Sequence, residues 1–89
     1  MNAAVSEAEI WSRAIQPGAG TFPVAAAREI LRLCLAELDV QRARELSAKS
    51  NAGELSAEET QELDHYLNVG RALELLKAKA RASLRVAGG

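Results

Sequence analysis

The chain is poor in the residues that build disulfides, aromatic cores and membrane spans. It has one cysteine, one tryptophan, one tyrosine and one phenylalanine in 89 residues. The single cysteine, Cys34, excludes an intrachain disulfide and favours a reducing compartment. No apolar run approaches the roughly 18 residues of a membrane span, and no signal peptide is visible. We therefore expect a cytoplasmic protein with no membrane contact, whose core is made of Leu, Ala, Ile and Val.

Charge is balanced overall but unevenly distributed. The net charge of −1 gives no global attraction to nucleic acid or to an anionic membrane. Residues 54–64 hold only acidic charges, whereas residues 71–89 hold five basic residues against Glu74 alone. This separation is what a helix dipole favours when acidic residues begin a helix and basic residues end it.

The periodicity of the apolar residues predicts an all-α, single-domain protein over residues 1–89, with four helices, a long last helix and frayed ends at 1–5 and 86–89. Ser6 and Glu9 form an S-x-x-E capping box, so the first helix is expected to begin near Ser6. The sequence Pro17-Gly18-Ala19-Gly20 should end it.

The second and third helices are predicted from weaker signals. Thr21 is the expected N-cap of the second helix, which would carry Pro23 in its first turn and run to about Glu37. Its apolar stripe makes it the most buried helix, with Cys34 as a buried, inert thiol and Leu33 and Leu38 widening the stripe. Asp39 is the expected N-cap of the third helix, over Val40 to about Ser50, and Gly53 is suited to the left-handed position after it.

The last helix is the most strongly marked segment. Ser56 and Glu59 form a second capping box, and no proline follows before Arg85. A helix of roughly 25–28 residues, about 40 Å long, is predicted. Gly70 lies in its middle, where glycine costs about 1 kcal/mol relative to alanine. We therefore expect another helix, from this chain or from a partner, to approach closely there, and the predicted partner-binding residues are Tyr66, Gly70, Leu73 and Leu76.

No pattern of catalytic or metal-binding residues is recognised. His65, the only histidine, has no companions at a ligand spacing, and the carboxylates of residues 58–64 crowd one end of one helix instead of facing each other across a cleft. We expect no enzyme activity, no metal and no cofactor. A basic cluster at the end of the last helix could contact nucleic acid phosphates: Lys77, Lys79, Arg81 and Arg85.

From Arg44 onward the chain resembles a set of small, uncharacterised bacterial helical proteins. Their motif is of the type E-L-D-x-Y-x-x-V-G-x-x-L-x-x-L-x-x-K-A-x-x-S-L. It is met here by Glu62-Leu63-Asp64, Tyr66, Val69-Gly70, Leu73, Leu76, Lys79-Ala80 and Ser83-Leu84. Genes of this set often lie beside one for an HNH-type endonuclease, so the resemblance implies an accessory or antitoxin-like partner of a nuclease and transfers no catalytic residue.

Three hypotheses for function follow. The first is a non-catalytic protein-interaction module, plausibly the accessory subunit or neutraliser of a nuclease, with acidic residues 58–64 able to mimic phosphate. The second is a small nucleic-acid-binding regulator, and the third is a homo-oligomeric helical protein in which Leu67, Leu73 and Leu76 pack against another copy. The terminal Gly88-Gly89 resembles the ends of double-glycine leader peptides and ubiquitin-like modifiers, but a frayed tail is the expectation.

Overall fold

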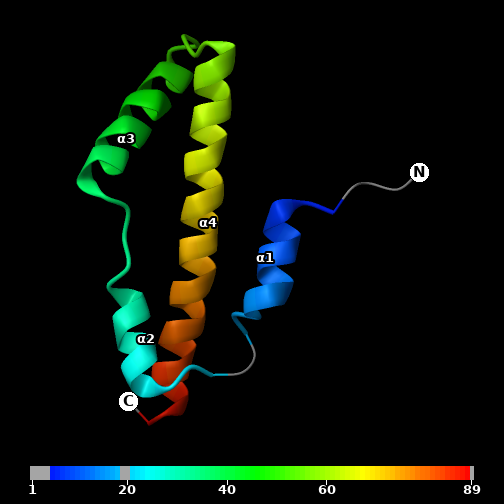
Figure 1. Cartoon of the computed structure of the whole chain (residues 1–89), viewed down its shortest axis with the longest axis vertical. Helices are drawn as coiled ribbons and strands as arrows, with labels where there is room; N and C mark the ends of the chain where they lie inside the picture. Colours follow the sequence, from blue (N-terminus) through cyan, green and yellow to red (C-terminus); the bar gives the residue numbers. More distant parts are fainter. Residues whose placement is uncertain (1–4, 19–20, 89) are drawn as a thin grey trace. The chain divides into compact units, whose positions relative to one another are not determined.

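The computed structural model describes residues 5–18 and 21–88, which form four helices and no strand (Figure 1). The prediction of an all-α protein with a long last helix is confirmed. The fourth helix has 30 residues, slightly more than expected, and is about 45 Å long at 1.5 Å per residue. The helices are α1 (Glu7–Ile15), α2 (Val24–Leu31), α3 (Glu37–Asn51) and α4 (Ala57–Val86).

The chain divides into two compact units, and α4 contributes to both. The terminal unit consists of Met1–Leu33 with Arg71–Gly89, and the hairpin unit consists of Cys34–Gly70. The expected single domain over residues 1–89 stays a prediction. Of the expected frayed ends, residues 1–4 and 89 lie outside the described residues, whereas Val86 is the last residue of α4.

Both predicted capping boxes are present. The Ser6 hydroxyl accepts from the Glu9 backbone N–H at 3.1 Å, and the Glu9 carboxylate accepts from the Ser6 N–H at 3.4 Å. The same reciprocal pair joins Ser56 and Glu59, with both bonds at 3.1 Å. The helices begin where these boxes predict because each box satisfies two N–H groups that the first turn leaves without partners.

The ends of α1 and α3 use left-handed residues. Gln16, with φ 53°, follows α1, so the helix ends just before Pro17, as the breaker sequence predicted. Gly53, with φ 70°, follows α3 in the predicted position. Its N–H donates to the Ser50 carbonyl at 3.0 Å, and the Glu54 N–H donates to the Lys49 carbonyl at 2.8 Å. These two bonds form a Schellman motif, which satisfies the last carbonyls of the helix.

The predicted boundaries between α2 and α3 are wrong. Pro23 is the N-cap residue of α2, with extended backbone, so Thr21 does not cap this helix and Pro23 is not in its first turn. The helix ends at Leu31, and α3 begins at Glu37 after the N-cap residue Ala36, which makes no side-chain cap bond. Asp39 lies inside the first turn of α3, where its carboxylate accepts a hydrogen bond from Tyr66 of α4 at 2.8 Å. The Asp39 side chain, which the sequence pattern assigned to the N-cap of the third helix, therefore makes a tertiary hydrogen bond instead.

The shorter α2 is not the most buried helix. Cys34 lies outside it and is exposed, and Leu33 and Leu38 are 44% and 79% exposed. The predictions of a buried thiol and of a stripe widened by these leucines are wrong, because the apolar period that carried them ends with the helix at Leu31. The buried apolar residues of the described chain are few and spread over all four helices: Ile15, Ala27, Leu46 and Ala80.

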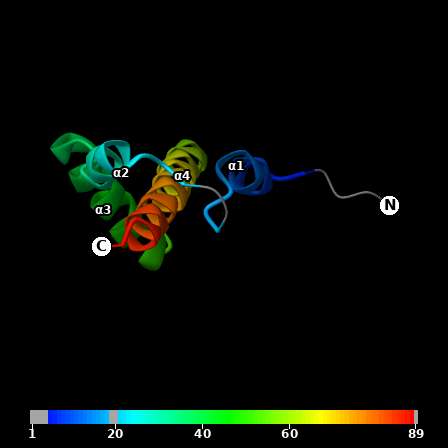
Figure 2. The ribbon, with the colours of Figure 1, turned by 90° about the horizontal axis from the view of Figure 1, so that it is seen from below.

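In the terminal unit, polar side chains of α4 bind backbone groups at the end of α1 and just before the start of α2. The two helices flank the α4 segment of this unit (Figures 1 and 2). Ser83, only 2% exposed, accepts from the Phe22 N–H at 2.8 Å and donates to the Lys79 carbonyl at 2.7 Å. The Lys79 ammonium donates to the Ile15 carbonyl at 2.8 Å and lies 5.1 Å from the centroid of the Phe22 ring. It therefore satisfies a carbonyl at the negative end of the α1 dipole.

Replacing Ser83 with alanine should lower the free energy of unfolding by about 1–3 kcal/mol, because the Phe22 N–H would lose its partner in a half-buried position. Urea unfolding followed by circular dichroism measures the change. Ser47→Ala is the matched control, since Ser47 is an exposed serine inside α3. It should gain up to about 0.5 kcal/mol from helix propensity. Equal effects of the two substitutions would contradict the role of Ser83.

Candidate interaction surface on α4

The first half of α4 is joined to α3 by a network of ion pairs in the hairpin unit. Arg42 donates through Nε and Nη2 to the two carboxylate oxygens of Glu62, both at 2.9 Å. Lys49 donates to Glu59 at 2.6 Å, and Glu59 also lies 3.5 Å from Arg42. The bidentate geometry of the Arg42–Glu62 pair fixes orientation as well as distance. Part of the acidic start of α4 thus faces a basic surface of the same chain.

These contacts change the acidity of the carboxylates. The hydrogen bond from Lys49, with the cap bond from Ser56, lowers the pKa of Glu59 from 4.5 to about 2. The hydrogen bonds from Arg42 lower the pKa of Glu62. Partners inside the chain therefore shift the protonation of both carboxylates to lower pH. Of the acidic residues expected to mimic phosphate, Glu58 and Asp64 are the ones that remain exposed.

Tyr66 is occupied by the same hairpin unit. Its hydroxyl donates to Asp39 at 2.8 Å, which raises the pKa of the Tyr66 phenol, and the side chain is half-buried. It therefore stabilises the packing of α3 on α4, and only part of its surface is open to a partner. Leu73 and Leu76, in the terminal unit, are also half-buried. Only part of the surface of each is therefore open to a partner.

Gly70 has open space beside it. Beyond the α4 backbone around it, a Cβ atom at this position would meet no atom of residues 5–18 and 21–88 within 4 Å, so these residues do not make the close approach that was expected from a helix of this chain. Two apolar residues beside it, Leu67 and Val69, are 46% and 48% exposed. The sequence pattern assigned Leu67 to a contact with another copy and Val69 only to the motif, and neither was among the predicted partner-binding residues, although both stand within three residues of the costly glycine.

The predicted basic cluster is partly engaged within the chain. Lys79 is bound to the Ile15 carbonyl and lies over the Phe22 ring, and Arg81 is 3.5 Å from Glu74. Arg85 is exposed, and Lys77 is half-buried. The four residues therefore do not present four equivalent cations to a ligand.

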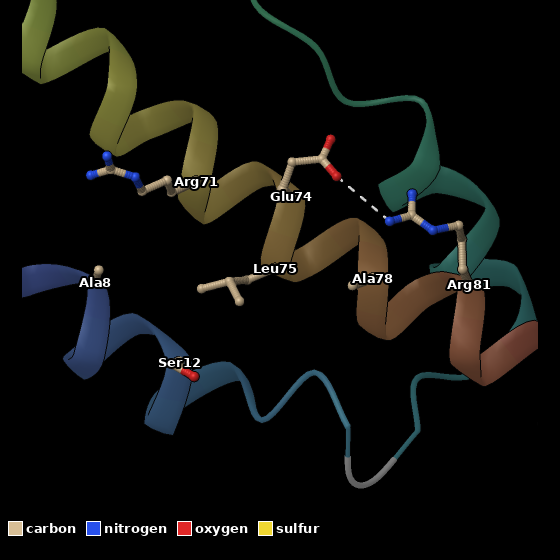
Figure 3. A pocket seen from close by; sticks show the side chains of 7 residues that line it. All are labelled: Ala8, Ser12, Arg71, Glu74, Leu75, Ala78 and Arg81. Carbon is tan, nitrogen blue, oxygen red and sulfur yellow. Dashed lines mark ion pairs between the residues drawn. The ribbon is translucent and has the colours of Figure 1, made fainter.

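A groove of about 450 Å³ lies between α1 and α4 in the terminal unit (Figure 3). Leu75 points from α4 toward α1, and small residues, Ala8 and Ala78, line the rest of its apolar wall. Arg71 and Arg81 come from α4 at its two ends, and Glu74 pairs with Arg81 beside it. The remaining lining residue is Ser12. The groove is thus apolar in the middle and charged at its rim.

Residues 5–18 and 21–88 contain no group of three or more His, Cys, Asp or Glu residues placed to hold a metal ion. None of the helices formed by these residues combines the length and the apolar character that crossing a membrane requires. Comparison with protein-family models, with curated proteins and with solved structures gave no match for this chain.

The depressed pKa of Glu59 predicts a specific loss of stability in acid. A group whose pKa falls on folding stabilises the native state above its unfolded value, so the contribution of Glu59 should disappear as the pH falls from about 4.5 toward 2. Glu59→Gln should flatten this part of the stability profile measured by urea unfolding. Glu58→Gln, at an exposed neighbouring position, should leave it unchanged. A profile of Glu59→Gln with the wild-type slope would refute the assignment.

The open space at Gly70 predicts that Gly70→Ala raises the free energy of unfolding by about 1 kcal/mol, the helix-propensity difference between the two residues. Thermal and urea unfolding of the purified chain measure it. Gly53→Ala should lower the free energy of unfolding instead, because a φ of 70° strains any residue with a Cβ. A destabilising Gly70→Ala would show that something within the chain occupies this position.

Proposed function

We propose that the chain is a non-catalytic protein-interaction module that acts in the cytoplasm and binds a protein partner through α4 around Gly70. The supporting observation is the energetic cost of Gly70 to the helix. Gly70 costs about 1 kcal/mol of helix stability, and among the described residues no atom outside the surrounding α4 backbone lies within 4 Å of the place that a Cβ would take. A partner helix that packs closely against the α4 backbone would use this space.

The exposed apolar residues around this position support the same proposal. Leu67 lies three residues before Gly70, so the two share one face of α4. Leu67 is 46% exposed in the isolated chain. Contact with a partner would remove this apolar surface from water beside a position where backbones can approach.

The proposed partner is a nuclease, for which the chain would be an accessory subunit or neutraliser. Support comes from the motif resemblance and from the two exposed carboxylates, Glu58 and Asp64, which could face a basic nucleic-acid-binding surface. Glu59 and Glu62 would act indirectly, because their ion pairs with Lys49 and Arg42 hold α3 and α4 together.

Contact with nucleic acid is a second candidate, supported by the exposed Arg81 and Arg85 near the end of α4. It is the weaker one, because Lys79 is bound to Ile15 and Arg81 is paired with Glu74. Such binding would weaken steeply as salt is raised.

Gly70→Leu should abolish capture of the partner in a pulldown from the native host analysed by mass spectrometry. The leucine side chain would fill the space that the partner backbone is proposed to occupy. It should leave the helix content of the purified chain intact, since the described part of the chain, apart from the adjoining α4 backbone, has no atom within 4 Å of the new Cβ.

Gly70→Ala and Val86→Asp serve as controls for this experiment. The alanine variant tests the effect of the smallest side chain, and the aspartate replaces an exposed apolar residue at the far end of α4. Both should retain more of the partner than Gly70→Leu does. Unchanged capture by a folded Gly70→Leu variant would rule out close approach at this position.

A further inference from the structure

The apolar and charged residues of the groove between α1 and α4 are complementary to residues on another part of α4. Its wall is apolar at Ala8, Leu75 and Ala78, and Arg81 stands at one end. On α4, Ala78 and Arg81 are three residues apart and therefore share a face. A helix that offered an apolar side chain and a carboxylate at the same spacing would complement this face.

Asp64 and Leu67 of α4 have that spacing, and both are exposed. We propose that the groove binds α4 of a second copy of this chain in the antiparallel direction, with Leu67 of the second copy against Ala78 and Asp64 against Arg81. This inference rests on the part of the proposed function that assigns a protein partner to α4, and it names a second copy, instead of a nuclease, as that partner.

The register is self-consistent along the helix. Setting Asp64 opposite Arg81 in antiparallel helices places Leu67 opposite Ala78, and it then places Arg71 opposite Glu74. Each of these pairs joins opposite charges or apolar groups, and a two-fold axis repeats each pair. The contacting positions follow one another at alternating steps of four and three residues, which is the spacing of a coiled-coil seam: Asp64, Leu67, Arg71, Glu74, Ala78 and Arg81.

The apolar walls of the groove would accommodate Leu67 of the second copy. In the second copy, Leu67 would enter between Ala78 and Leu75 on α4 and Ala8 on α1, where small side chains leave room. Arg81 would exchange its exposed 3.5 Å contact with Glu74 for Asp64 of the second copy. An exposed ion pair of this kind contributes little, so its loss would oppose the pairing only weakly.

Sedimentation equilibrium of the full chain, from micromolar to millimolar concentration, tests the proposal. We expect a concentration-dependent dimer. Leu67→Asp should abolish it, whereas Val69→Asp should leave it unchanged, because residues two apart on a helix point in different directions. Val69 is a matched control, since it is 48% exposed where Leu67 is 46%. Circular dichroism would verify that both variants fold.

A charge exchange tests the register. Asp64→Arg and Arg81→Asp should each raise the dimer dissociation constant by about tenfold or more by placing like charges opposite each other. The double variant should restore the wild-type value. A chain that stays monomeric at all concentrations, equal effects at positions 67 and 69, or a double variant no better than the singles would each overturn the proposal. If the chain is monomeric yet captures a protein in a Gly70-dependent way, the proposed function stands and the self-pairing fails.

Discussion

The side chains of α4 supply the polar contacts that position the other helices. In the hairpin unit, Glu59, Glu62 and Tyr66 bind three side chains of α3. In the terminal unit, Lys79 and Ser83 bind backbone groups at the end of α1 and before the start of α2. Because the described chain buries few apolar residues, these directional contacts define which surfaces of the helices meet.

This arrangement explains which features of the fold were predictable from sequence. A capping box joins residues three apart, so Ser6 with Glu9 and Ser56 with Glu59 could be read directly. Gly53 is similarly local, because its left-handed conformation depends on the turn in which it lies. At these positions the determining interactions lie within one turn, and sequence and structure agree.

Other features of the structure depend on partners that are distant in sequence. Asp39 is a plausible N-cap in isolation, but Tyr66, 27 residues later, takes its carboxylate. Lys79 reads as one of several surface cations, but its ammonium binds a carbonyl 64 residues away. For the candidate surface, sequence identified Gly70 as costly, and only the structure showed that a Cβ there would meet no atom of another described segment within 4 Å.

The terminal unit also has a consequence for the order of folding. Its defining bonds, Phe22 to Ser83 and Lys79 to Ile15, close loops of 61 and 64 residues, whereas Lys49–Glu59 and Arg42–Glu62 join residues 10 and 20 apart. Closing short loops costs less entropy, so the hairpin unit is favoured to form first. During synthesis, α1 cannot make its contact with Lys79 until the chain has grown by 64 residues beyond Ile15. The packing of α1 therefore follows the formation of the hairpin unit.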